Sequence, residues 1–167
     1  MMADERTFFP HQPSTINHSE AEVRAMKWIT REHAKVDRVA CPWLISRFID
    51  RTPEFIFVPR EQVEEVARKE CAIPYDIPGA DLGHKDGKCS FDAFIEKYDL
   101  KDPALALLAK IVRAADTDDR SAASEGDGLR AIATGFSLLG HDDFKLMELE
   151  FPMYDALYAW CQSRTTA

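Results

Sequence analysis

The chain has no excess of positive charge. Its 21 Lys and Arg residues stand against 29 Asp and Glu residues, which gives a net charge of −8 at pH 7. A surface that follows nucleic-acid phosphates needs clustered Lys and Arg side chains. We therefore expect no direct nucleic-acid partner for this chain.

The sequence also lacks long apolar runs and common cofactor motifs. No run approaches the roughly 20 apolar residues that span a bilayer, and the N-terminus has no basic region followed by an apolar one, as a secretory signal would. The four cysteines form no Cys-x-x-Cys pair, and no dinucleotide fingerprint is present. We expect a cytoplasmic protein with reduced thiols, no membrane partner and no nucleotide cofactor.

The domain organisation is simple. With 167 residues the chain is long enough to bury one core without disulfides. Residues 1–25 are polar and irregular, which predicts a flexible N-terminal tail, whereas residues 26–164 carry the periodic patterns of a single domain.

The first half alternates β-prone and helical patterns. Short apolar runs predict strands at 28–30, 55–58 and 75–77, and amphipathic segments between them predict two helices. The first helix should begin near Asp37, with Pro42 at or near its first turn. Helical crossovers between successive strands produce a parallel sheet, so we predict an α/β (mixed α+β) fold with three parallel strands.

The second half reads as entirely helical. Ser90 is the expected cap of a short helix, and Asp102 with Pro103 opens the next one. Asp116 lies on the apolar stripe near the C-terminus of that helix, where a carboxylate is disfavoured unless a positive partner is near. Pro152 should either kink the last helical segment or start a new helix, which should be apolar nearly all round.

The loop between the third strand and the following helix carries little apolar surface. It holds three glycines and one imidazole, His84. Ligands of open parallel sheets bind beyond the carboxyl ends of the strands, and this loop leaves such an end. A binding site is therefore expected there, although an ordinary surface turn with an exposed His explains the loop alone equally well.

Several runs, in the right order, resemble the C-terminal domain of the ChrB family of chromate-resistance proteins. The runs are residues 28–32, 37–45, 76–79, 82–84, 89–92, 115–118 and 154–158. The resemblance covers residues 27–162. It implies a role in bacterial chromate resistance or its regulation, and a domain that also occurs fused to other modules, rhodanese-like ones included.

The first hypothesis for the site is a divalent metal ion. Neutral imidazole with carboxylates suits Zn, Mn or Fe, and we expect His84, Asp116 and Asp37 to converge on one ion. Further candidates are Glu32, Asp92 and Asp118. The simpler alternative pairs the two aspartates with nearby arginines and leaves His84 as a hydrogen-bonding loop residue.

The second hypothesis is an oxyanion site. Chromate is a tetrahedral dianion like sulfate, and Arg31 and Arg38, with Glu32 on the same edge, offer charge-assisted donors beside a helix N-terminus. We therefore predict a domain that binds a metal ion, an oxyanion or both. The alternative is a metal-dependent redox enzyme that takes its electrons from a substrate, a bound redox metal or a partner. A regulatory or rhodanese-like domain or protein is a candidate partner of this chain.

Overall fold

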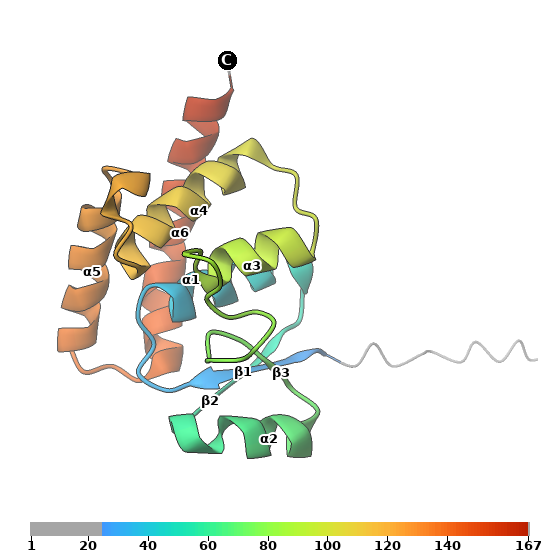
Figure 1. Ribbon diagram of the computed structural model, residues 1–167. Coiled ribbons are helices and arrows are strands. Elements are labelled where there is room, and N and C mark those ends of the chain that lie inside the picture. Colours follow the sequence, from blue (N-terminus) through green and yellow to red (C-terminus); the bar gives the residue numbers. More distant parts are fainter. Residues whose placement is uncertain (1–24, 167) are drawn as a thin grey trace, which may run out of the picture.

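The computed structural model describes residues 25–166 (Figure 1). The tail predicted for residues 1–25 lies, apart from Ala25, outside these residues. In chain order the elements are β1 (Lys27–Arg31), α1 (Asp37–Leu44), a π-helical turn (Ile45–Ile49), β2 (Glu54–Val58), a 3-10 turn (Arg60–Gln62), α2 (Val63–Glu70), β3 (Ile73–Pro74), α3 (Ser90–Lys97), α4 (Pro103–Asp116), a 3-10 turn (Arg120–Ala122), α5 (Gly126–Leu138) and α6 (Asp143–Thr165).

The predicted fold class is confirmed by a parallel sheet in the order β2-β1-β3. Trp28 of β1 is paired with Phe55 of β2 on one side and Ile73 of β3 on the other. Because β1 is the central strand, Trp28, Ile29 and Thr30 are completely buried. Both faces of a parallel sheet are normally covered by helices, and this one follows the rule.

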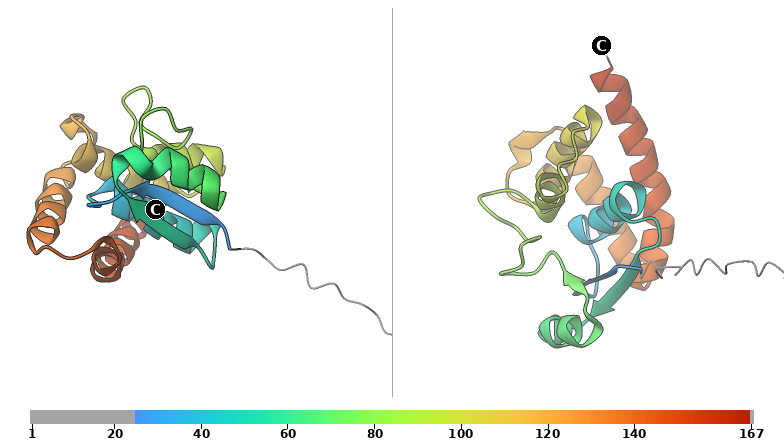
Figure 2. Two further views of the ribbon diagram at one scale, coloured as in Figure 1. Left: turned by 90° about the horizontal axis from the view of Figure 1, so that it is seen from below. Right: turned by 90° about the vertical axis from the view of Figure 1, so that its right-hand side faces the viewer.

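The two faces of the sheet are covered unequally. Ile29 points to α2 and packs in a small cluster with Val63 and Ala67. Trp28 points to the other face, where α1, α3, α4 and α6 enclose the main core. Figures 1 and 2 show α2 alone on one side of the strands and the other helices together on the opposite side.

The third strand is shorter than predicted and begins earlier. It covers Ile73–Pro74, so the prediction of a strand at 75–77 is wrong for most of that range. Tyr75 still donates its backbone N–H to Ile29, but Asp76 has a φ of 49° and turns the chain out of the sheet. β3 therefore ends two residues before Asp76.

Pro42 lies inside α1 and not in its first turn. Proline has no N–H group, so α1 lacks the hydrogen bond from residue 42 to the carbonyl of Arg38. The expectation failed because the burial of this helix outweighs the loss of that bond. Seven of the eight residues of α1 are buried, Pro42 and Trp43 among them. Local helix propensity is a weak guide where burial is this complete.

The second half is helical, as predicted. Asp102 caps α4 by accepting a hydrogen bond from the Ala104 N–H at 2.8 Å, which confirms that helix start. Two details differ from the expectation: the cap of α3 is Cys89 and not Ser90, and Pro152 lies within α6 without starting a new helix. Trp160 of α6 is 39% exposed.

None of the helices in the described part of the chain has both the length and the apolar character needed to cross a membrane.

Candidate metal centre

The candidate site lies where the carboxyl ends of β1 and β3 diverge. Asp37 begins α1 after β1, and Asp76 follows β3. In the order β2-β1-β3, the connection after β1 leads to β2 on one side of β1, whereas β3 lies on the other side. The gap between β1 and β3 is therefore the point at which the chain connections diverge. Open α/β sheets bind their ligands in this kind of crevice.

Local loop geometry brings His84 over this edge. A Cβ on Gly83 would lie 2.7 Å from the carbonyl oxygen of Ile77, so only glycine lets the two parts of the loop approach this closely. Beyond His84, Lys85 and Lys88 pair across the turn formed by Asp86 and Gly87, both of which have positive φ. His84 is thus held between two constrained segments.

Three carboxylates surround one nitrogen atom of His84. Its Nε2 lies 3.0 Å from Oδ2 of Asp116, 3.1 Å from Oδ1 of Asp76 and 3.4 Å from Oδ2 of Asp37. The structure therefore brings the three predicted residues together with a fourth, Asp76. The imidazole side chain is 45% exposed, whereas the Asp37 side chain is fully buried and the Asp76 side chain is 5% exposed.

Asp37 joins α1 to the N-terminus of α3. Its carboxylate accepts hydrogen bonds from the backbone N–H groups of Ser90 at 2.6 Å and Phe91 at 3.1 Å. These two donors have no partner within their own helix, and the positive end of the helix dipole favours the negative charge. The fold can therefore hold a buried carboxylate here that still faces His84.

Asp76 was missed by sequence reasoning, which placed it inside the third strand. Its carboxylate accepts hydrogen bonds from Arg38 at 3.1 Å and from the Ser90 hydroxyl at 3.0 Å. The signal was an acidic residue directly after a short, proline-containing strand at the binding edge. Ser90 does not cap α3, because its hydroxyl donates to Asp76.

Asp116 is the last residue of α4. It accepts a hydrogen bond from the Asp37 backbone N–H at 3.3 Å, and its Oδ2 lies 3.0 Å from Nε2 of His84. Arg130 compensates the same helix end by donating to the carbonyls of Ala114 and Thr117.

Burial and mutual contact shift the pKa values of the cluster. Burial raises the pKa of Asp37 well above its usual value, although the His84 hydrogen bond opposes the change. Hydrogen bonds to Asp116, Asp37 and Asp76 raise the pKa of His84. Burial also disfavours the charged form of Asp76, but His84, Arg38 and Ser90 together outweigh it and lower the pKa of that carboxyl.

The distances fit the donor set of a small divalent ion. With bonds of about 2.0 to 2.2 Å, neighbouring donors lie about 2.8 to 3.1 Å apart around an octahedral ion and about 3.3 to 3.6 Å apart around a tetrahedral one. The contacts of His84 with its three carboxylates, from 3.0 to 3.4 Å, fall within these limits. Donor atoms of Asp37, Asp76 and His84 also lie within 4.8 Å of one another. These three residues are the best-placed ligands, with Asp116 against the imidazole.

Comparison with known proteins gives the family. Residues 28–161 match the family model described as ChrB, C-terminal domain. The chain belongs to this family. It is 34% identical over 139 residues to Protein ChrB of Cupriavidus metallidurans, a match that covers 82% of this chain and 41% of that protein. The chain thus spans less than half the length of this relative, and no solved structure matches it significantly.

The residues proposed for an oxyanion site are partly occupied by contacts with other protein groups in this ChrB C-terminal domain. Arg38 is engaged with Asp76 and with the backbone carbonyl of His33. Glu32 faces His33 at 3.6 Å and does not join the cluster. Arg31 is the most available of the three, since its nearest carboxylate oxygen, on Asp76, is 4.0 Å away.

Two other candidate ligands are not grouped with the three best-placed residues, although Asp118 shares a hollow with His84. Asp92 is held by a two-pronged ion pair with Arg113, at 2.7 and 3.0 Å. Asp118 lines a 380 Å³ hollow on the α4 side of His84.

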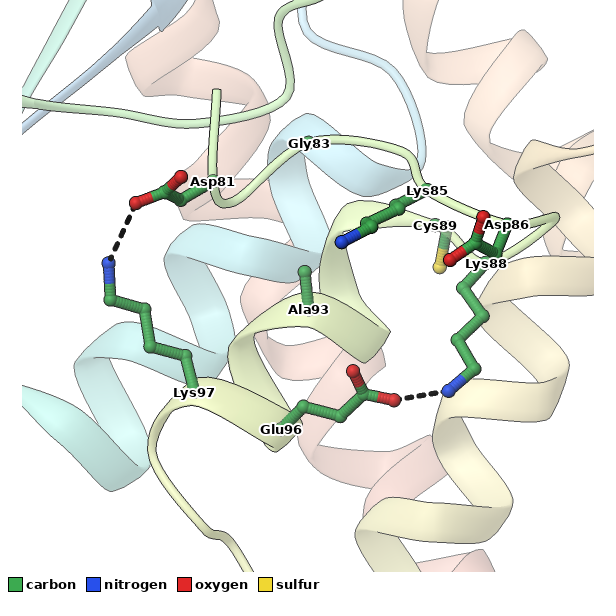
Figure 3. A pocket seen from close by; sticks show the side chains of 9 residues that line it. All are labelled: Asp81, Gly83, Lys85, Asp86, Lys88, Cys89, Ala93, Glu96 and Lys97. Atoms are coloured by element: carbon green, nitrogen blue, oxygen red, sulfur yellow. Dashed lines mark hydrogen bonds and ion pairs between the residues drawn. The ribbon is translucent and has the colours of Figure 1, made fainter. Parts of the chain in front are cut away.

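A separate hollow beside α3 does not extend the metal centre (Figure 3). It has a volume of 440 Å³, and its lining includes three acidic and three basic side chains. Lys88 pairs with Glu96, and Lys97 pairs with Asp81 across the mouth. Burial raises the pKa of the Cys89 thiol, which is therefore protonated and a poor nucleophile.

Proposed function

We propose that this domain binds a divalent transition-metal ion through His84, Asp76 and Asp37, and that it does so in the bacterial response to chromate. The family supports the chromate role, which the resemblance implies. The observation that carries the metal proposal is the convergence of three carboxylates on one imidazole nitrogen. An ion at this point would neutralise charges that otherwise face one another in a mostly buried space.

Each residue has a distinct part in the proposed site. His84 supplies the nitrogen ligand from a loop. Asp37 and Asp76 supply oxygen ligands that α3 and Arg38 already orient. Asp116, at the end of α4, lies 3.0 Å from the same His84 nitrogen and would serve as a further oxygen ligand. One imidazole with several oxygens suits Mn, Fe or Zn better than the softer Cu(I).

A metal-dependent redox enzyme is the second candidate. His84 is half exposed, so an ion bound there would keep coordination positions open to a substrate. All four cysteines are free, in keeping with a reducing cytoplasm. Because the chain spans 41% of its relative, a partner domain or protein is a reasonable electron source for such an enzyme.

The proposal is tested by metal analysis of protein purified without a histidine tag. We expect about one equivalent of Mn, Fe or Zn in the wild type and none in His84→Ala or Asp76→Ala. His141→Ala is the matched control, because His141 is exposed and outside the cluster. Equal metal content in the wild type and the His84→Ala variant, or none in a wild type incubated with each ion, would refute the site.

A metal-free ion-pair network is the competing explanation for the same geometry. In that case His84 is protonated and bridges the aspartates without any ion. Added Mn, Fe or Zn would then leave the melting temperature of the wild type unchanged. On the metal proposal, saturating ion raises the melting temperature of the wild type and leaves that of His84→Ala where it was.

A further inference from the structure

A pocket adjoins the candidate metal centre at the diverging ends of β1 and β3. It has a volume of 260 Å³ and is lined by Arg31, Asp76, Ile77, Pro78 and His84. Arg31 is the last residue of β1, and the other four belong to the segment that follows β3. The pocket therefore occupies the position at which parallel sheets of this order bind small molecules.

Arg31 gives this pocket a positive charge that is only weakly compensated. Its side chain is 36% exposed, and the Asp76 oxygen 4.0 Å away also accepts from Arg38 at 3.1 Å. The Nε atom of Arg31 has no hydrogen-bond partner among the described residues. Burial, more than the nearby charge of Arg38, lowers the pKa of Arg31, and the carboxylates of Asp76 and Asp116 oppose the change.

Ile77 and Pro78 form an apolar part of the pocket wall. They also line a 440 Å³ hollow together with Arg60. Pro78 has no N–H group, so this wall offers few hydrogen-bond donors. A ligand that uses the whole pocket needs a negative group for Arg31 and an apolar part for this wall.

We propose that the pocket binds a small organic acid. Its carboxylate pairs with the Arg31 guanidinium, whose planar fork matches two carboxylate oxygens, and its apolar part lies against Ile77 and Pro78. An inorganic tetrahedral anion would satisfy Arg31 but has no apolar part to place on the wall. The contact with Arg31 is independent of the metal; only a further contact to an ion at His84 rests on the proposed function.

The test is a calorimetric titration of the wild type with two probes, isovalerate and sulfate, each with and without Mn²⁺. We expect isovalerate to bind at least tenfold more tightly than sulfate. Arg31→Gln should weaken isovalerate binding at least tenfold, whereas Arg51→Gln, at an exposed position away from the pocket, should leave it unchanged. Ile77→Ser should remove the preference for isovalerate while keeping the binding of sulfate.

The outcomes separate this inference from the proposed metal site. Equal binding of sulfate and isovalerate, or isovalerate binding that Arg31→Gln does not weaken, overturns the organic-acid site even if the metal binds. Isovalerate binding that depends on Arg31 and Ile77 in a protein that binds no metal would support the pocket and refute the metal proposal. The Ile77→Ser variant keeps the test valid if Arg31→Gln is poorly folded.

Discussion

Asp37 accepts hydrogen bonds from the first N–H groups of α3 while one of its oxygens lies 3.4 Å from Nε2 of His84. One buried carboxylate thus serves both as a helix cap and as a candidate ligand. The two roles can be separated by substitution, because an amide can still accept a hydrogen bond but carries no charge.

Asp37→Ala should destabilise the protein more than Asp37→Asn. Alanine leaves the Ser90 and Phe91 N–H groups buried without an acceptor, at a cost of about 1 to 3 kcal/mol each. Asparagine retains one acceptor oxygen and also removes the cost of a buried charge. Chemical denaturation of the metal-free variants measures the difference. If both variants are equally stable, the capping role is wrong.

Metal binding should release protons and weaken as the pH falls. Contacts with Asp116, Asp37 and Asp76 raise the pKa of His84, so the ion must displace a proton from the imidazole. Calorimetry at pH 7 in two buffers of different ionisation enthalpy measures the number released. Binding without proton release would contradict the assignment of His84 as ligand.

Glu150→Gln should stabilise the protein at pH 8 and have little effect at pH 5. Glu150 is 1% exposed, its Oε2 has no partner among the described residues, and burial raises its pKa to about 7. The pKa of Glu150 is near 4.5 in the unfolded chain and higher in the folded protein. The free energy of unfolding therefore falls as the pH rises from the unfolded-state pKa through the folded-state pKa. We expect a gain of roughly 1 to 3 kcal/mol at pH 8.

Urea denaturation at the two pH values measures this gain. Glu148→Gln is the matched control, since Glu148 lies on the same helix, is exposed and pairs with Lys145. Its effect should stay within about 0.5 kcal/mol at both pH values. A gain from Glu150→Gln that is the same at pH 5 and pH 8 would rule out the linkage.

Gly126→Ala and Gly135→Ala should change stability in opposite directions. A Cβ on Gly126 would lie 2.4 Å from the Cβ of Ala114, so α5 would have to move away from α4, at a cost of about 1 to 3 kcal/mol. Gly135 faces open space in the same helix, and alanine there should add about 0.5 to 1 kcal/mol through its helix propensity. Thermal unfolding distinguishes the two. An unchanged or raised melting temperature of Gly126→Ala would refute the packing argument.

The sequence predicted the sheet because its evidence was local. The runs at 28–30 and 55–58 are β-prone and separated by amphipathic helices, which leaves few topologies. Pro42 and Ser90 were misplaced for the opposite reason, because distant contacts decide their positions. Almost all of α1 is buried, which outweighs the unfavourable effect of Pro42 within the helix. The Ser90 hydroxyl donates a hydrogen bond to Asp76 and therefore does not cap α3.

The candidate site was predictable in part. His84 and Asp116 were each conspicuous, one as the imidazole of a glycine-rich loop and one as a carboxylate at the unfavourable end of a helix. Asp76 could not be singled out in this way, because its position at the site depends on β3 ending at Pro74 and on the positive φ of residue 76. Its contact with Arg38, 38 positions earlier in the chain, has no local signature in the sequence.

Asp37 and Asp76 each have a structural role in addition to their proposed role as metal ligands. Asp37 is needed by α3, and Asp76 is needed by Arg38 and Ser90, so both would be kept by a protein that had lost the ion. His84 contacts the carboxylates through Nε2 and has no comparable structural task among the described residues. On the proposed function, the residue at position 84, and not the aspartates around it, therefore distinguishes the family members that can bind the ion.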